Sequence, residues 1–259
     1  MAAAGRRRAA SARTARIASA RTTRPNPPGA HALADHVAAR LVRQSPVTPD
    51  DLVLDLGAGT GALTLPLART GARVIAVERD ARAARRLTAV VARYPNVTVV
   101  CGDALTVPLP RRPYLVVANI PFGITTALLR RLLDSPLSAA DLVVERGAGL
   151  GLTAARPGRA ELLWWQAGFR LTRGATLPAT VFRPPPSVDA LVLHIHRRPQ
   201  PPPAGLARLL RRAYRSAGAP VGHVVGRSAA RRAGVDPRLP VVHLTADEWV
   251  GIAQGQAGR

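Results

Sequence analysis

The segment 51–61 reads DLVLDLGAGTG, and this stretch decides the fold of the chain. Its first six residues are rich in leucine and valine and predict a buried β-strand. Gly57, Gly59 and Gly61 follow at once, and glycines at this bend allow a tight turn into a helix and a close approach of the backbone to a ligand. Their spacing is GxGxG, whereas a dinucleotide pyrophosphate favours GxGxxG. The stretch therefore predicts an α/β sheet with a ligand site at a strand end.

Further strands and helices alternate along the chain around this segment. Strands are expected at 72–77, 97–101, 114–118 and 141–145, and helices at 33–43, 61–70, 81–94 and 125–133. This alternation predicts βαβ units and a parallel sheet that is covered on both faces. Two later strands, at 169–177 and 188–196, flank the proline-rich loop FRPPPS and are expected to pair antiparallel at the sheet edge.

Composition divides the chain into three parts. Residues 1–24 hold seven arginines, no acid and almost no large apolar side chain, which predicts a disordered basic arm. Residues 25–196 carry the α/β pattern. Residues 197–259 have helical character, with nine arginines and no acid between Arg197 and Arg232, which predicts a small helical domain with a basic face that suits nucleic acid.

Charge is the most informative bulk property. The 259 residues include 37 basic side chains, all arginine, against 15 acidic ones, which gives a formal net charge of +22. A field of this size favours a polyanionic partner, and nucleic acid fits best. No apolar run approaches the roughly 18 residues of a membrane span. With Cys101 as the single cysteine, expected to be buried on its strand, no internal disulfide can form, and we expect a monomeric cytoplasmic protein.

Acidic residues follow the second and third expected strands. Glu78 ends the second strand about 20 residues after the glycines, where a carboxylate can accept hydrogen bonds from a ribose diol. Asp103 follows the third strand, where it could meet the amine of a cofactor adenine. Either acid alone could be a helix cap. Together with the glycines, they indicate a ligand that contains adenosine.

The motif NIPF, residues 119–122, follows the fourth strand and is the most specific motif in the chain. An adenine N6 is a poor nucleophile, and two acceptors on its N–H bonds favour a directed lone pair. The Asn119 side-chain oxygen and the Ile120 carbonyl could be those acceptors. Pro121 fixes the bend, and Phe122 offers a face for a flipped base. Catalysis would rest on positioning and electrostatics; the alternative is a plain turn with a core phenylalanine.

Five motifs carry a resemblance to a known family. DLGAGTG, VERD, CGDAL, NIPFGITTALLRRLL and LPATVFRPPPSVDALVLHI match, in order and spacing, the Erm family of ribosomal RNA adenine N6-methyltransferases, which is related to the KsgA-type dimethyladenosine transferases. The match runs from about residue 25 to 195. It implies a class I (Rossmann-like) core that depends on S-adenosylmethionine, with a small C-terminal α-helical domain. The implied reaction methylates N6 of an adenine in 23S rRNA and confers macrolide, lincosamide and streptogramin B resistance.

The resemblance also implies roles for individual residues. Cofactor contacts are expected from His31, Leu33, Gly57, Gly59, Gly61, Glu78, Asp103 and Asn119. Phe122 would stack on the target base and Phe182 would help to hold it. RNA contacts are expected from Arg197, Arg208, Arg211, Arg212 and Arg215. The family's N-terminal motif resembles Gly-Gln-Asn/His-Phe-Leu, and this chain departs from it at Ala30 and Ala32.

Several alternatives remain open at this point. A nucleotide-dependent oxidoreductase would need GxGxxG and gives NIPF no role. A 16S rRNA enzyme, a DNA adenine enzyme, and a non-catalytic RNA-binding protein on a decayed methyltransferase fold all fit the composition. His194 and His196 share a strand face, but no cysteine or acid cluster accompanies them in the sequence, so no metal site is expected.

Overall fold

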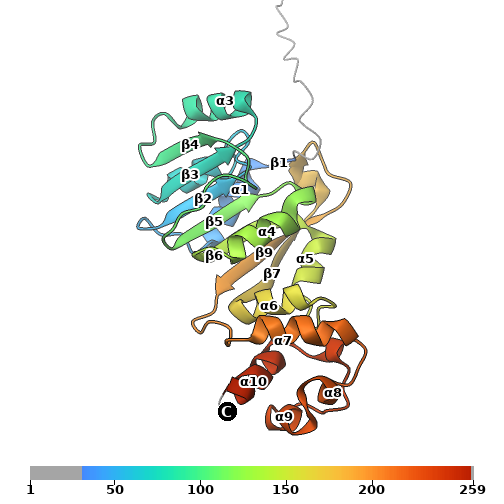
Figure 1. Ribbon diagram of the computed structural model, residues 1–259. Helices are drawn as coiled ribbons and strands as arrows, with labels where there is room; N and C mark the ends of the chain where they lie inside the picture. The colour runs from blue at the N-terminus through green and yellow to red at the C-terminus, as the bar shows by residue number, and fades with distance from the viewer. Residues whose placement is uncertain (1–30, 258–259) are drawn as a thin grey trace, which may run out of the picture.

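The computed structural model describes residues 31–257 and is built on a seven-stranded sheet, whose place in the molecule is seen in Figure 1. Its strands are β2 (Leu52–Leu56), β3 (Arg73–Glu78), β4 (Val97–Cys101), β5 (Tyr114–Asn119), β6 (Leu137–Glu145), β7 (Phe169–Leu177) and β9 (Ala190–Arg197). Their order across the sheet is β4-β3-β2-β5-β6-β9-β7. The first five in this order are parallel, and β9 runs antiparallel to both β6 and β7. The expected parallel sheet with an antiparallel edge is confirmed.

Helices cover both faces of this sheet. They are α1 (Asp35–Gln44), α2 (Thr64–Ala68), α3 (Ala81–Val91), α4 (Thr125–Leu133), α5 (Arg146–Leu152) and α6 (Ala160–Gly168). One apolar cluster joins β2 residues such as Leu54 to α4, α5 and α6. A second joins the alternate residue Val53 to α1 and α2. Because neighbouring residues of a strand enter opposite clusters, the strands read as continuous apolar runs.

A short two-stranded sheet, which the sequence pattern does not predict, lies beside the main one. Its strands are β1 (Ala32–Leu33) and β8 (Phe182–Arg183), and they pair antiparallel. Since Leu33 is taken up by this pairing, α1 begins at Asp35, two residues later than expected. The expected arm at 1–24 and Ala30 lie outside the described residues.

Three other expectations are corrected. Helix α2 begins at Thr64 instead of Gly61, because Gly61 has a φ of +95°, which no α-helix tolerates. Strand β6 begins at Leu137, four residues before the expected start. Cys101 is exposed and not buried, because β4 is an edge strand of the sheet.

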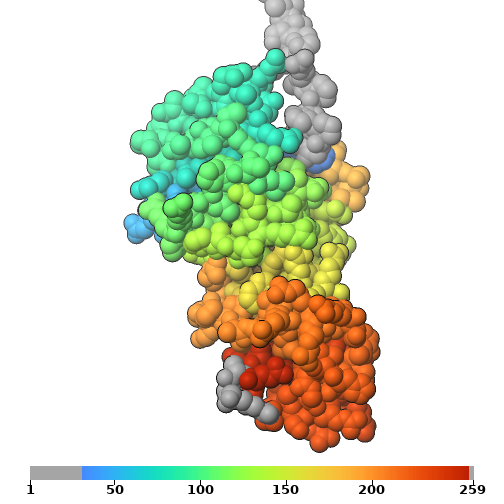
Figure 2. All heavy atoms as spheres, viewed as in Figure 1, coloured from blue at the N-terminus to red at the C-terminus, as the bar shows by residue number. Residues whose placement is uncertain are grey.

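The C-terminal region is helical, as expected. It contains α7 (Leu206–Ala213), α8 (Val221–Val225), α9 (Arg227–Arg232) and α10 (Ala246–Ala257). Short 3-10 turns are found at Phe122–Ile124, Ala179–Val181, Tyr214–Ser216 and Val241–His243. Helices α7 to α10 form a second lobe beside the sheet (Figure 2). Within the described residues, no helix is both long and apolar enough to span a bilayer.

Helix α6 belongs to both lobes. Trp165 is 3% exposed and packs in the cluster of the sheet, so the expectation that at least one of the paired tryptophans is a core residue is confirmed. Leu163 is fully buried in the cluster of the helical lobe, together with Trp249 from α10. Trp164, on the same helix, packs against both clusters.

Candidate active site

The glycine loop after β2 has the backbone that its sequence requires. Gly57, Gly59 and Gly61 all have positive φ, at +78°, +55° and +95°. The Gly57 N–H donates to the carbonyl of Val77 at 2.8 Å, which ties the loop to β3. A Cβ added to Gly61 would lie 2.6 Å from a methyl carbon of Leu87, so glycine also lets α3 pack closely. The loop is therefore fixed in a shape that only glycine adopts without strain.

Glu78 lies beside this loop at the end of β3. One of its carboxylate oxygens accepts from the Gly59 N–H at 2.8 Å and the other from the Asp80 N–H at 2.7 Å. A carboxylate oxygen can accept a second hydrogen bond, so both remain able to bind a ligand hydroxyl. The backbone holds the side chain in place before a ligand arrives. This position and orientation suit the two hydroxyls of a ribose.

Asp103 and the loop behind it lie beyond the next strand. The parallel register places Glu78 opposite Cys101, two residues before Asp103. One oxygen of Asp103 accepts from the Leu105 N–H at 2.8 Å, and the other lies 3.9 Å from the Arg79 guanidinium. The side chain keeps substantial exposure, so the aspartate can meet a ligand at the same edge of the sheet.

Arg131 clamps the loop after Asp103, and no sequence signal identifies it. From α4, its guanidinium donates to the carbonyl of Ala104 at 2.5 Å and to that of Val107 at 2.7 Å. Helix α4 follows the NIPF motif, so this clamp joins the segment of the expected target site to the loop of the expected cofactor site. Arg131 is 27 positions from Ala104 and 24 from Val107 along the chain, so only folding brings them into contact.

Asn119 ends β5 with its amide in a defined orientation. Its side-chain nitrogen donates to the carbonyl of His31 at 2.7 Å. Because the nitrogen is used in this way, the side-chain oxygen is the atom left to accept a hydrogen bond. A Cβ added to Gly57 would lie 3.7 Å from the ring of Pro121 and 3.8 Å from the Asn119 carbonyl. The glycine loop and the NIPF motif thus meet at one edge of the sheet.

The remaining NIPF residues divide between surface and core. Ile120 is 2% exposed as a residue, and its side chain packs in the core of the sheet. Phe122 begins a 3-10 turn and is half-buried, with its ring centroid 6.1 Å from that of His31. His31 is fixed by a hydrogen bond from its Nδ1 to the carbonyl of Pro184 at 2.8 Å. Phe122 is therefore partly open and lies next to His31, whose carbonyl holds the Asn119 amide.

Phe182 and Leu33 are both buried and pair with each other. Phe182 is 2% exposed and pairs with Leu33, itself 4% exposed, across β1 and β8. Both side chains pack in the apolar cluster under α1. Burial gives Phe182 a structural role against the strand that follows His31, and its expected part in holding the base stays a prediction. The expected cofactor contact of Leu33 likewise stays a prediction.

Asp55 is a buried acid directly behind the glycine loop. Its Oδ2 accepts from the Thr64 hydroxyl at 2.6 Å, and only 1% of the residue is exposed. Burial raises the pKa of its carboxyl to about 7, and the charge of nearby Glu78 adds to the rise. The sequence shows Asp55 within DLGAGTG, but only the structure shows that its protonation changes near neutral pH.

Replacing Asp55 by asparagine should flatten the dependence of stability on pH. Because folding raises the pKa of Asp55 from 3.8 to about 7, the contribution of this carboxyl to stability is complete below about pH 4 and is lost as the pH rises towards 7. The asparagine side chain would stay neutral and could still accept from Thr64. Urea unfolding at several pH values would measure how the free energy of unfolding changes with pH. Equal slopes in the wild type and the variant between about pH 4 and 7 would contradict the raised pKa of Asp55.

The arginines expected to contact RNA differ in their surroundings. Arg208, Arg211, Arg212 and Arg215 are all exposed on or just after α7. Arg197 instead donates to the carbonyls of Leu137, at 2.8 Å, and Ser135, at 2.5 Å, and its guanidinium lies 4.5 Å from the centre of the Phe169 ring. Arg197 therefore holds the start of β6, although it is exposed like the other four arginines. The RNA contacts of all five stay predictions.

His194 has an acidic neighbour that the linear sequence does not reveal. Its Nδ1 lies 2.6 Å from Oδ1 of Asp141, which is opposite it in the β6–β9 register and 2% exposed. Within residues 31–257, no cluster of three or more histidine, cysteine or acidic residues accompanies this pair. The pair is a structural contact across two strands.

The sheet order and the chemistry at its carboxyl edge define a class I methyltransferase fold. A family model described as ribosomal RNA adenine dimethylase matches residues 32–213, and the chain belongs to this family. An rRNA adenine N-6-methyltransferase of Bacillus licheniformis is 32% identical over 182 residues, 69% of this chain and 63% of that protein. The match thus spans less than two thirds of that relative.

Other similar proteins extend the comparison. An rRNA methyltransferase of Streptomyces thermotolerans is 33% identical over 244 residues, 85% of this chain and 79% of that protein. The crystal structure of the 23S rRNA methyltransferase ErmE matches with a TM-score of 0.78 and 25% identity, over 86% of this chain and 98% of that one. A dimethyladenosine transferase from Plasmodium falciparum, at 18% identity and a TM-score of 0.72, shares the fold.

Proposed function

We propose that this chain transfers a methyl group from S-adenosylmethionine to N6 of an adenine in 23S rRNA, and so confers macrolide, lincosamide and streptogramin B resistance. The observation that carries the proposal is the oriented amide of Asn119. Its nitrogen is held by the His31 carbonyl at 2.7 Å, so its oxygen is available to the amine of a base. Similarity to the ErmE structure and to the named rRNA methyltransferases supports RNA as the substrate.

The residues behind Asn119 fit S-adenosylmethionine. Gly57, Gly59 and Gly61 form a tight loop at the sheet edge, and Glu78 is held against it with free acceptor capacity. Asp103 adds an acceptor for the adenine amine beyond the next strand. We propose that these residues bind the cofactor, which supplies a methyl group activated by its sulfonium. The short separation between the glycine loop and the NIPF motif would place that group beside the target base.

The chain's own part in the reaction would be to hold the amine. Asn119 Oδ1 and the Ile120 carbonyl accept the two N–H groups of the base, which localises the nitrogen lone pair towards the methyl group. Phe122 stacks on the base and compensates for the stacking lost when it leaves the RNA. The methylated nitrogen then loses one proton to water. Such catalysis rests on fixed dipoles, so it needs no strong base.

A small-subunit enzyme is the second candidate. A protein of Thermotoga maritima named ribosomal RNA small subunit methyltransferase A is 32% identical over 169 residues, 64% of this chain and 60% of that protein. The same adenine chemistry would serve a site in 16S rRNA. The geometry of the NIPF motif recognises the base and does not distinguish the two RNAs.

Mapping methylated adenines in rRNA from cells with and without the protein tests the proposal. We expect a new N6-methylated adenine in 23S rRNA, detected by mass spectrometry of nuclease fragments, together with raised resistance to a macrolide. Cells that carry the Asn119→Ala variant are the matched control. A new mark confined to 16S rRNA would support the second candidate. Unchanged methylation of both RNAs, with RNA binding retained, would indicate a non-catalytic RNA-binding protein.

A further inference from the structure

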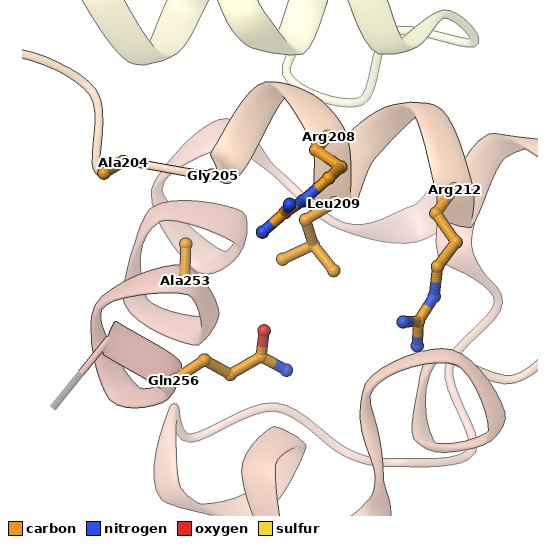
Figure 3. Close-up of a pocket in the computed structure, with 7 residues that line it drawn as sticks. All are labelled: Ala204, Gly205, Arg208, Leu209, Arg212, Ala253 and Gln256. Atoms are coloured by element: carbon orange, nitrogen blue, oxygen red, sulfur yellow. The ribbon is translucent and has the colours of Figure 1, made fainter. Parts of the chain in front are cut away.

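A pocket of about 350 Å³ opens between α7 and α10 in the helical lobe (Figure 3). Arg208 and Arg212 line it from α7, and Gln256 lines it from the end of α10. Leu209 and Ala253 add apolar wall. The pocket therefore combines two cationic groups and one amide over a small apolar surface, and it lies on different elements from the glycine loop and the NIPF motif.

The spacing of residues on α7 explains why both arginines line this pocket. Leu206, Leu209 and Leu210 face the core of the helical lobe. This leaves Arg208 and Arg212 on one side of the helix, because residues four apart are neighbours on a helix surface. Arg212 also donates to the carbonyl of Val224, which restrains its guanidinium at the pocket wall. Two like charges that line one pocket repel each other, and an anion between them would relieve this repulsion.

The protein itself provides no such anion among the described residues. No acid lines the pocket, and neither arginine forms an ion pair within residues 31–257. Asp247 on α10 is bound by Arg198 at 2.7 Å, and Glu248 caps its own helix by accepting from Thr245. The pocket is thus positively charged and has no counter-ion from the described part of the chain.

We infer that this pocket grips a phosphate of the RNA backbone, away from the adenine that is methylated. The inference deepens the proposed function, because it rests on RNA being the substrate. Guanidinium groups bind phosphate oxygens in pairs of parallel hydrogen bonds. Gln256 can bond to a ribose hydroxyl or to a further phosphate oxygen, and the apolar wall fits a sugar. Such a contact fixes the register of the RNA without reading its sequence.

Titration of a fluorescein-labelled RNA hairpin with an adenine-containing loop tests this inference. The variant Arg208→Ala/Arg212→Ala should bind the hairpin about tenfold more weakly or worse, because charge-assisted hydrogen bonds are lost. Its plot of log affinity against log salt, between about 50 and 200 mM, should be shallower by about 1. The matched control is Arg111→Ala/Arg112→Ala, which removes two exposed arginines before β5 and should leave both quantities unchanged.

Further variants and probes distinguish loss of RNA binding from loss of folding. Arg208→Ala alone keeps the contact of Arg212 with Val224, so it should melt like the wild type and still bind RNA more weakly. An unchanged salt slope in a folded variant, or an equal loss in the control, would overturn the inference. The inference would also be overturned if the wild type bound inorganic phosphate or AMP, and the double variant lost this binding but still bound RNA normally. Assays of methyl transfer and S-adenosylmethionine binding by the wild type test the proposed function separately.

Discussion

Replacement of Asn119 by alanine should slow methyl transfer by about 10²- to 10³-fold, the usual cost of removing one fixed group that stabilises a developing charge. The variant loses the proposed acceptor for the base amine and also the hydrogen bond to the His31 carbonyl. Single-turnover rates with saturating S-adenosylmethionine and RNA would measure the effect. Binding of each partner, measured alone, would show how much of the loss comes from affinity.

Asn96→Ala is the matched control for this substitution. The Asn96 amide donates to the carbonyls of Ala68 and Ala72 at 2.8 Å each, before β4 and away from the carboxyl edge of the sheet. Its loss should lower the melting temperature and leave the rate per folded molecule unchanged. A normal rate of methyl transfer by the folded Asn119→Ala variant would rule out the proposed hydrogen bond from the base amine to Asn119.

Replacement of Phe182 by alanine should destabilise the protein by about 3–5 kcal/mol, the range for removing a buried phenylalanine ring. Phe182 is 2% exposed and packs with Leu33 under α1, so the variant would leave a cavity there. Urea unfolding would measure the free energy of unfolding. Such a loss is a large part of the roughly 5–15 kcal/mol that stabilises most domains.

Two further variants sharpen this measurement. Phe182→Leu keeps most of the volume and should cost under about 1.5 kcal/mol. Phe122→Ala removes a half-buried ring, so it should cost less stability than Phe182→Ala and should reduce methylation instead. If Phe182→Ala kept wild-type stability and only weakened RNA binding, the ring would contact the base after all, and the structural role would be wrong.

The sequence was most informative where local pattern and function coincide. Apolar runs that end in glycine, Glu78, Asp103 or Asn119 predict strands and site residues together, since parallel strands bring their carboxyl ends to one edge. The class I fold and the rRNA adenine methyltransferase family are confirmed. The assigned roles of the site residues stay predictions, apart from the burial of Phe182 and the structural contacts of Arg197.

What the sequence does not predict depends on contacts between distant segments. The pairing of β1 with β8 joins residues about 150 apart, and each strand has only two residues, which is too short for a periodic pattern. Arg131 reaches the loop after Asp103 through tertiary packing. His194 lies opposite Asp141 because of the register between β6 and β9. Arginine-rich segments also conceal which guanidinium groups bind carbonyls of the protein itself, as Arg197 does.

Helix α6 has a consequence for how this protein can be divided. Leu163 contributes to one core and Trp165 to the other, and Trp164 touches both, so neither lobe can lose its partner without exposing large apolar side chains to water. The molecule should consequently melt in a single all-or-none step. Truncation after β9 would leave a fragment that is prone to aggregate. A chimera that takes its two lobes from different relatives should fold only if each face of α6 comes from the same relative as the lobe that it packs against.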